Sequence, residues 1–577
     1  MAPAVPDSEK APRGVPAFPL LWLLVPQIAA FAFFGNVPWA DEISVSRRLI
    51  AGTLFLAFSA SACAFESLSE RSSARSRAAA FFWRLCFPAA AFFLFGAWWS
   101  LRAPPFVDLS GTPAREAEIV LRVEKPFSPS EKNFGGIARA ESVSGVGGEA
   151  LAGARVRYSF AKEHFPEGAD APREGRLLRA TGVLSGIDEA HVPSAEFRGY
   201  LRRERVSASF SRAERVEPVG AGEGVFPAFF AEAGKCLRER FAEISSGSGF
   251  ASRAGNVLGA MLFGDRSTLS PEQKRNFLLT GTMHVFAVSG LHIAVLAAGA
   301  LRFLRFCRCP RVPAWALTLA GLWFYVQLVG APPSATRAWQ MCLFIFLGTL
   351  FGRGRMAFHG LAASAFVALT LDPVVIENAG FRLSYFATAG ILLYGVPAAE
   401  GLGAFVRARA NPPLSLPAPL RRFAEAFLRA CVGAFCVSFA AFLAGTPGVV
   451  EMFGVCSFTS LAANVVFVPL VFLAVWAGAA AAAVACVPFA GALAGKWIFA
   501  LAALPAAALD AGTEFVAGAP AVLELSFPCA GFGAFGALLT LALFFLGAYF
   551  PPLRERPVAR YALPPFALAV FLLCCAF

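Results

Sequence analysis

Charged residues are scarce in this chain of 577 residues, because Asp, Glu, Lys and Arg together make up only 15% of it. Hydrophobic residues make up 57%, and the mean hydropathy is +0.61. A soluble globular protein of this length needs far more polar surface. The composition therefore excludes a soluble chain and predicts a polytopic membrane protein, with apolar runs of about 18 residues or more as its spans.

Histidine is also rare, and its spacing excludes the common hydrolytic metal sites. The five histidines are His164, His191, His284, His292 and His359, and none belongs to an H-x-H-x-D-H or H-E-x-x-H pattern. Cysteine is absent from the polar region 105–225, which excludes a disulfide framework there. We therefore expect no metal, no cofactor and no enzymatic activity.

Nucleotide-binding motifs are missing as well, although two segments imitate them. GFGAFG at 531–536 matches G-x-G-x-x-G, but no strand precedes it and no acidic residue follows about 20 positions later. GALAGKW at 491–497 has Trp497 where a phosphate-binding loop needs Ser or Thr for magnesium. We interpret the first segment as a helix whose small residues allow close packing, and any ATP-driven step must come from a partner.

Long apolar runs, in contrast, are abundant. Three open the chain, near 17–35, 48–65 and 78–99, and ten follow, near 283–303, 312–330, 338–352, 356–372, 379–397, 424–449, 455–486, 488–509, 531–549 and 562–577. Arginines cluster after alternate runs, as Arg302, Arg305, Arg308 and Arg311 do, and such clusters mark the cytoplasmic side. The sequence predicts about 10–13 spans.

The polar region between the third and fourth runs reads as a small β domain on the extracytoplasmic side. Segments 118–124, 154–160, 175–184 and 205–210 are rich in β-forming residues and are separated by Gly and Pro. A barrel of the oligonucleotide-binding type fits their number and spacing, and a β-sandwich fits equally well. The predicted domains are membrane spans at 1–104, the β domain at 105–222, amphipathic or interfacial helices at 223–270, a membrane domain at 271–510 and further spans at 511–577.

Polar residues within the membrane domain are candidate functional residues, because an ionisable group at the centre of a span costs about 3 kcal/mol. His284 and His292 lie about 80° apart if one helix carries both. Ser289 and Gly290 stand between them and could break that helix at a water-filled cavity. The alternative is that His284 lies at the water interface and His292 packs against a neighbouring helix.

Three other polar groups fall near the predicted outer side. Ser334 and Arg337 follow Pro332-Pro333 and begin a span, where a guanidinium suits a phosphate or a carboxylate. The others are Arg382 and Ser384, preceded by Asp372, Glu377 and Asn378, and Asn464 in an apolar run. Plain alternatives are ion pairs of Glu377 with Arg382 or Asp372 with Arg337, and a helix–helix hydrogen bond of Asn464. Together these groups predict a pore or transporter.

Four segments of the sequence resemble the ComEC-type competence protein family. They are GDRSTLSPEQKRNFLLTGTMHVFAVSGLHIAVL (264–296), PPSATRA (332–338), DPVVIENAGFRLSYFATAGIL (372–392) and LAANVVFVPL (461–470). FRGYLRRERV (197–206) is similar to a family stretch before the last strand of the β region. The resemblance covers most of residues 15–510. It implies an oligonucleotide-binding-type domain and a channel that passes one DNA strand across the bacterial inner membrane.

The resemblance also implies partners and roles. His284, Ser289, Gly290, His292, Ser334, Arg337, Arg382, Ser384 and Asn464 would line or shape a hydrated path, and Arg198, Tyr200, Arg202, Arg203, Phe381 and Tyr385 would contact single-stranded DNA by charge and stacking. Expected partners are membrane lipid, a cytoplasmic helicase or ATPase motor and an extracytoplasmic DNA receptor. Many family members carry a C-terminal metallo-β-lactamase-like domain, and this sequence lacks its histidine motif, so a separate nuclease is expected.

Two other functions remain open from the sequence. In a proton-coupled transporter of a small molecule or ion, His284 and His292 would relay protons. A structural scaffold would instead dock envelope proteins through residues 105–225. A homo-oligomer is compatible with each of these functions.

Overall fold

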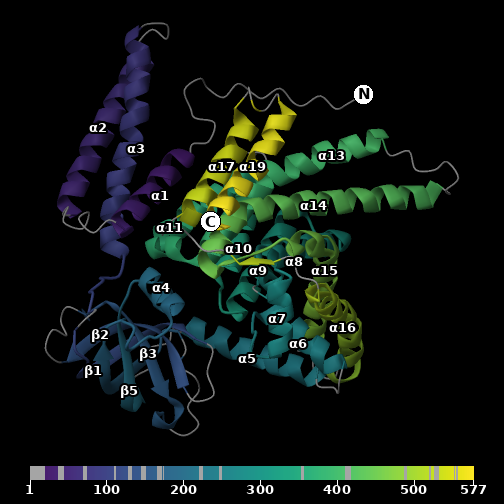
Figure 1. The fold of residues 1–577 in the computed structure, drawn as a ribbon, viewed down its shortest axis with the longest axis horizontal. Helices are drawn as coiled ribbons and strands as arrows, with labels where there is room; N and C mark the ends of the chain where they lie inside the picture. Colours follow the sequence, from purple (N-terminus) through teal and green to yellow (C-terminus); the bar gives the residue numbers. More distant parts are fainter. Residues whose placement is uncertain are drawn as a thin grey trace. The chain divides into compact units, whose positions relative to one another are not determined.

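The computed structural model of the full chain divides into two compact units, which are described separately (Figure 1). The first comprises residues 1–224 and 362–378, and the second comprises residues 225–361 and 379–577. The structure describes residues 20–36, 45–68, 74–109, 112–127, 133–144, 151–165, 172, 174–219, 225–245, 250–286, 288–351, 357–409, 418–485, 490–518, 522–524, 532–550, 553 and 556–576.

The first unit opens with three helices, α1 (Leu21–Asn36), α2 (Val45–Leu68) and α3 (Ala74–Arg102). In Figure 1 the purple ribbons of α2 and α3 run side by side, and Phe55 and Phe93 stack between them with their ring centroids 5.8 Å apart. The end of α11 (Ala357–Leu371) joins this group, because Thr370 accepts hydrogen bonds from Gln27 Nε2 at 2.9 Å and, through its carbonyl, from Trp98 Nε1 at 2.9 Å.

The β domain consists of β1 (Arg115–Pro126), β2 (Asn133–Ser144), β3 (Arg155–Ala161), β4 (Leu177–Ser185) and β5 (Val206–Pro218). Hydrogen-bonded neighbours follow the order β1-β2-β3-β5-β4, and β4 pairs back with β1, so the strands form a closed ring. All pairs are antiparallel except β3 with β5. Inward side chains such as Ile119, Leu121 and Phe160 are fully buried and form its core.

Four of the five strands overlap the predicted segments, and β2 was not predicted. Its sequence, NFGGIARAESVS, has two glycines, two alanines and two serines where a strand pattern calls for branched residues. The glycine at 136 has a packing reason, because a Cβ there would lie 2.6 Å from the carbonyl oxygen of Lys125 and 2.6 Å from the Tyr158 hydroxyl. The close approach of β1 and β3 thus requires a residue that otherwise signals a turn.

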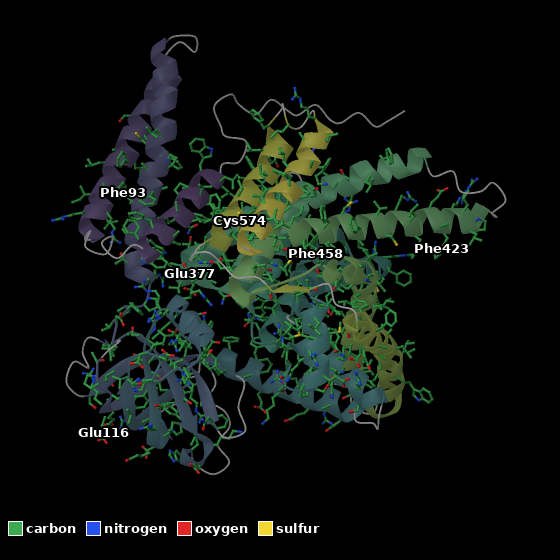
Figure 2. The ribbon with its side chains drawn as sticks, in the orientation of Figure 1. Phe93, Glu116, Glu377, Phe423, Phe458 and Cys574 are labelled. Atoms are coloured by element: carbon green, nitrogen blue, oxygen red, sulfur yellow. The ribbon has the colours of Figure 1, made fainter. Side chains whose placement is uncertain are left out.

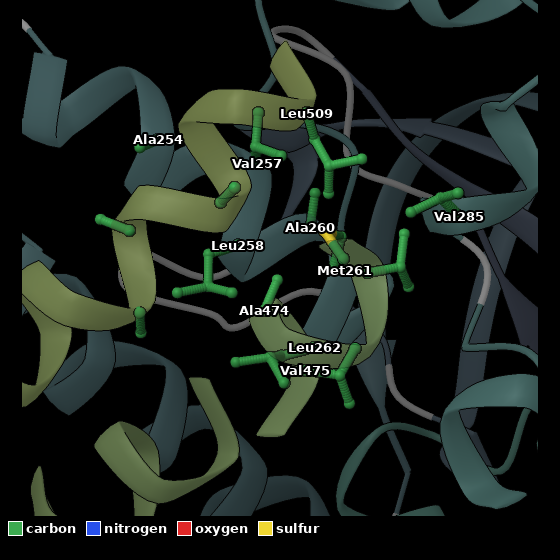
Figure 3. Packing of buried hydrophobic residues seen from close by; sticks show 14 of the residues in the cluster. Ala254, Val257, Leu258, Ala260, Met261, Leu262, Val285, Ala474, Val475 and Leu509 are labelled. Carbon is green, nitrogen blue, oxygen red and sulfur yellow. The ribbon is translucent and has the colours of Figure 1, made fainter. Parts of the chain in front are cut away.

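The second unit is built around a helix that the sequence placed at the membrane interface. Helix α6 (Phe250–Phe263) packs against α15 (Thr459–Ala485) and α16 (Ala490–Ala517) and buries Val257, Leu258 and Met261 completely. Figure 3 shows these side chains among Ala474, Val475 and Leu509. One side of α6 is thus enclosed by apolar neighbours, and the amphipathic or interfacial character predicted for residues 223–270 stays a prediction. The adjoining helices are α5 (Val225–Ser245) and α7 (Pro271–Leu279).

The remaining helices of this unit overlap the predicted apolar runs, except for residues 396–409, which form a helix where a loop was predicted. They are α8 (Gly290–Phe306), α9 (Arg311–Leu328), α10 (Pro333–Leu350), α12 (Ala379–Gly390), α13 (Val396–Arg409), α14 (Ala418–Phe453), α17 (Phe532–Tyr549) and α19 (Pro557–Ala576), with a short pair of strands, β6 (Val455–Ser457) and β7 (Val522–Glu524). A π-helical turn, Ile391–Gly395, joins α12 to α13.

Within the described residues, five helices are long and apolar enough to cross a membrane. They are Leu85–Arg102, Pro419–Met452, Thr459–Ala485, Trp497–Ala517 and Val558–Cys575, and Leu21–Phe34, Ala357–Leu371 and Phe535–Tyr549 are shorter apolar helices. Figure 2 shows the contrast between these carbon-rich helices and the β domain around Glu116, where nitrogen and oxygen atoms are dense. The structure is thus mostly helical with a small sheet domain, and the count of about 10–13 spans stays a prediction.

The two imitations of nucleotide motifs are helical. Residues 491–497 belong to α16, and 532–536 begin α17. A Cβ at Gly533 would lie 2.5 Å from the Cβ of Glu451, and one at Gly536 would lie 2.5 Å from the ring of Phe571. These glycines let α17 approach α14 and α19 closely, as the packing interpretation predicts.

Candidate functional site

The segment 281–292 does not form the single helix expected from the sequence. A 3₁₀ helix, Met283–Phe286, comes first, and α8 begins only at Gly290. Gly281 has a φ of +69°, and Ser289 is extended, with φ −94° and ψ 168°. His284 and His292 therefore lie on different helices, and the predicted angle of about 80° between them is wrong. The break at Ser289 and Gly290 is present.

Ser289 and His292 explain why a new helix starts here. The Ser289 N–H donates to His292 Nδ1 at 3.0 Å, and the Ser289 hydroxyl lies 2.9 Å from the same nitrogen. The side chain three residues into α8 thus satisfies a backbone group of the residue before it, in the manner of a capping box. His292 is 1% exposed, and because Nδ1 accepts a hydrogen bond, Nε2 carries the hydrogen of the neutral ring.

Helix α10 holds the break in place from the other side. Ser334, in its first turn, donates from Oγ to the Val288 carbonyl at 2.7 Å. Three residues further along lies Arg337, which is only 5% exposed. A Cβ on Gly290 would lie 3.0 Å from Arg337 Nη2, so the guanidinium rests against the first residue of α8. Two segments 40 or more positions apart in the sequence therefore meet at the helix break.

Aromatic rings from α12 complete the surroundings of Arg337. The guanidinium carbon lies 5.1 Å from the centroid of the Tyr385 ring, a cation–π contact, and Phe381 packs on Tyr385 with centroids 4.4 Å apart. Nε and Nη1 of Arg337 are buried and have no hydrogen-bond partner within the described part of the chain. No carboxylate among the described residues of its own unit pairs with it, and His292 Nε2 likewise has no partner there.

Other predicted residues lie at the edges of this cluster. His284 is exposed, and its Nδ1 lies 3.2 Å from the Gly281 carbonyl. Arg382 and Ser384 are half-buried on α12, on the same helix as Tyr385. Asn464 is half-buried on α15, one turn after Ser460, which lies against Gly281. The structure brings Ser289, Gly290, His292, Ser334, Arg337, Phe381 and Tyr385 together.

Sequence reasoning missed a buried polar group that joins α16 to α6 and to the start of α7. Asp510 on α16 is 6% exposed; it accepts a hydrogen bond from Gln273 Nε2 at 3.1 Å and pairs with Arg253. Gln273 also closes a capping box with Ser270 at the start of α7. An acidic residue inside an apolar run was the available signal.

In the β domain, the predicted DNA-contacting residues lie on α4 (Ala195–Arg203). Arg198 Nη1 donates to the Val192 and Pro193 carbonyls at 2.6 and 2.8 Å, so this arginine stabilises its own loop. Tyr200 stacks on Phe197, and burial together with the negative charge of Glu204 raises the pKa of its hydroxyl to about 12. Arg202 and Arg203 are exposed.

Buried charges behind α4 are paired. Glu124 contacts Arg139 and Arg155 at 2.7 Å each, and Glu204 contacts Lys125 at 2.6 Å. Arg155 Nη1 also donates to the Glu204 carbonyl at 3.1 Å. Burial opposes ionisation of Glu124, but the charges of Arg155 and Arg139 outweigh it and lower the pKa of this carboxyl. Within the described residues, no three His, Cys, Asp or Glu side chains are placed to hold a metal ion.

Comparison with known proteins now places this arrangement in a family. The model of the family described as competence protein matches residues 261–551, half of the chain. The chain belongs to the competence protein family. The matched region contains the whole cluster around Arg337 and excludes the β domain.

Individual relatives of the family match shorter stretches. ComE operon protein 3 of Bacillus subtilis (strain 168) is 27% identical over 220 residues, which are 38% of this chain and 27% of that protein. An uncharacterized protein of Aquifex aeolicus (strain VF5) is 35% identical over 136 residues, 23% of this chain and 32% of that protein. The uncharacterized protein YcaI of Escherichia coli (strain K12) is 31% identical over 138 residues, 23% of this chain and 18% of that protein.

The chain thus covers a third or less of the length of each of these relatives. No solved structure matches it significantly. The similarity to ComE operon protein 3 agrees with the family assignment. The apolar helices are consistent with a multi-pass membrane protein.

Proposed function

We propose that this competence-family chain conducts a single strand of DNA across the bacterial inner membrane. The observation that carries the proposal is the buried cation Arg337 at the broken helix, inside the region that the family model matches. A membrane protein retains an unneutralised charge at such a site only where it serves a polar or anionic cargo. A strand of phosphodiesters is a cargo of that sign.

The β domain supplies the second part of the proposal, a receiving surface on the extracytoplasmic side. The strand order β1-β2-β3-β5-β4 and the small size support a barrel of the oligonucleotide-binding type, which binds strands through its β2–β3 face and its β1–β2 and β4–β5 connections. Helix α4 lies in the β4–β5 connection and presents Arg202 and Arg203 beside the Phe197 and Tyr200 rings. Exposed cations next to aromatic faces suit sequence-tolerant binding.

Energetics require a partner for this transport. Moving each phosphate inward against an inside-negative potential costs about 2.3 kcal/mol per 100 mV. A conduit lowers the barrier for the strand but supplies no free energy, so a cytoplasmic motor has to pull it. The chain itself acts by binding and guiding, not by breaking bonds.

The test is uptake of fluorescent DNA in the native host. Wild type, a deletion, and the double variant Arg202→Glu, Arg203→Glu are compared for DNA that reaches the cytoplasm and DNA that stays outside it. The matched control is Arg122→Glu, Arg179→Glu, which makes the same charge change on β1 and β4, where surface ion pairs contribute little. We expect the deletion to abolish cytoplasmic label and the α4 variant to reduce it severalfold. Normal uptake in the deletion strain would refute the proposal.

A further inference from the structure

The groups around Arg337 suit the binding of an anion. No carboxylate among the described residues of this unit neutralises the charge of Arg337. We propose that the Arg337 guanidinium and the N-terminus of α8 bind a phosphodiester group, and that in transport this group belongs to the DNA strand. The inference rests on the function proposed above and adds the place where a phosphate is held. Its ligand chemistry, a phosphodiester oxyanion, is shared by nucleic acids and by lipid headgroups.

Arg337 provides the charge. It is 5% exposed, and its Nε and Nη1 hydrogens have no acceptor within the described residues. A buried charge without a partner is strongly unfavourable unless a counter-ion or polar ligand completes its environment. A guanidinium presents parallel N–H groups along two edges, Nε with Nη2 and Nη1 with Nη2, and either edge matches two oxygens of a phosphate. Each edge of Arg337 contains one of its two unpartnered nitrogens together with Nη2, the nitrogen that lies against Gly290.

Helix α8 provides the second set of donors. Its 17 residues carry an aligned dipole whose positive end is at Gly290, and the first-turn N–H groups of a helix have no partner inside it. Arg337 lies against this end, 3.0 Å from where a Cβ of Gly290 would stand. A larger residue at 290 would make this contact tighter than ordinary van der Waals contact and would require the guanidinium to shift by a few tenths of an ångström. The N–H of His292 Nε2, which has no partner within the described residues, belongs to the same turn.

The neighbouring contacts keep the guanidinium in position without neutralising it. Ser334 ties α10 to the Val288 carbonyl at 2.7 Å, which fixes the helix that carries Arg337 relative to the start of α8. The Tyr385 ring covers one face of the guanidinium at 5.1 Å and leaves the hydrogens in the guanidinium plane available. Cation–π contact attracts the charge but accepts no hydrogen bond, so an anion can bind while the ring stays in place.

The experiment uses the purified full-length chain in a phosphate-free maltoside detergent. Binding of a fluorescent oligothymidylate is compared with that of its methylphosphonate analogue, whose backbone is uncharged. The variants are Arg337→Gln, Arg337→Lys and Gly290→Ala, and the control is Arg305→Gln, which removes the same charge from an exposed position late in α8. Phospholipid retained per chain is measured on the same samples.

We expect Arg337→Gln to weaken binding of the phosphodiester strand by about tenfold or more, because a hydrogen-bonded charge is lost, and to leave the neutral analogue unaffected. Arg337→Lys should weaken binding less than Arg337→Gln does. Gly290→Ala should also weaken binding, but less than Arg337→Gln, because the added Cβ shifts the guanidinium by only a few tenths of an ångström. If the Arg337 variants lose a retained phospholipid instead while oligonucleotide binding is unchanged, the phosphodiester site is a lipid site and the DNA assignment is wrong. Unchanged binding of both ligands in folded Arg337→Gln would overturn the site.

Failure of this inference differs from failure of the proposed function. If deletion of the gene leaves uptake intact while Arg337→Gln loses its preference for a charged backbone, the site exists but competence is not its use. If deletion abolishes uptake while Arg337→Gln binds and transports DNA normally, the proposed transport function is supported and the phosphate site is refuted.

Discussion

Replacing Arg337 with Met should make the empty protein more stable while it impairs function. Most buried arginines stabilise a structure through their partners, so their removal unfolds it. Arg337 differs because Nε and Nη1 lack acceptors within the described residues, and its main contact is the Tyr385 ring. A linear apolar side chain of similar length fills the same space and has no charge to bury.

The magnitude follows from two opposing terms. An arginine at the middle of a membrane helix costs about 3 kcal/mol relative to an apolar residue, and this is an upper bound for Arg337, the fifth residue of α10. The cation–π contact with Tyr385 recovers about 1 kcal/mol of this cost. Arg337→Met should therefore stabilise the ligand-free chain by up to about 2 kcal/mol. For a chain of this size the change corresponds to an increase in unfolding temperature of about 4 °C or less.

The assay is thermal unfolding of the purified chain monitored by differential scanning calorimetry, which also registers the β domain, where residues 105–225 contain no cysteine. Arg155→Met is the matched comparison, because Arg155 is buried to the same degree, 6% exposed against 5%, but contacts Glu124 and Glu204. Its loss removes one of the two cations that each of these carboxylates contacts, so among the described residues Glu124 keeps only Arg139 and Glu204 keeps only Lys125. Breaking a buried ion pair costs about 3–5 kcal/mol, so Arg155→Met should destabilise the β domain by up to about that amount. Adding an oligonucleotide at about 100 times its Kd should stabilise the wild type by about 2.7 kcal/mol and Arg337→Met by much less.

An outcome in which Arg337→Met destabilises the ligand-free chain as strongly as Arg155→Met would refute the reasoning. It would mean that Arg337 is neutralised within the folded chain. The same substitution at two equally buried arginines thus separates a charge reserved for a ligand from a charge used for folding.

Two further predictions concern the β domain and the packing of α8. Because the pKa of Glu124 is lowered on folding, its ionisation stabilises the folded state above its ordinary pKa of 4.5, and this stabilisation is lost as the pH falls below that value. Unfolding temperatures measured from pH 7 to pH 3 should fall steeply in the wild type. Glu124→Gln should be less stable at pH 7, and its unfolding temperature should fall less with pH. Equal slopes of unfolding temperature against pH would contradict the lowered pKa of Glu124. A Cβ at Gly299 would stand 1.6 Å from the Trp476 ring, so Gly299→Ala should lower stability by about 1–3 kcal/mol, and Gly299→Ala with Trp476→Leu should recover much of the loss.

The sequence predicted the helices better than the strands for a physical reason. The thickness of the bilayer sets the length of an apolar run that can cross it. Most ends of the predicted runs lie within a few residues of the ends of α9, α14 and α17. Strand β2 was missed because the requirement for Gly136 comes from Lys125 and Tyr158 on other strands, which no local pattern shows. Burial of α6 is equally non-local, since it depends on α15 and α16.

The sequence predicted which residues belong to the candidate site, but it did not predict how they contact one another. Ser289, Gly290, Ser334 and Arg337 stand out as polar or small residues in apolar surroundings, which is a local signal. Their meeting depends on the hydrogen bond from Ser334 to the Val288 carbonyl and on the new helix that His292 starts, and neither is encoded in spacing. The helical angle between His284 and His292 failed because it assumed a continuous helix.

The arrangement around Arg337 suits passage better than storage. A conduit must bind each phosphate strongly enough to bring it into the membrane and weakly enough to release it to the next position. A site with a carboxylate beside the arginine would repel the strand, and a site with several fixed cations would hold it. One guanidinium on a tyrosine face, next to a helix dipole, gives attraction without a second charge. Under the proposed function, each phosphate that binds would offset the cost of burying Arg337 without a partner, and the strand would meet no site that holds it tightly.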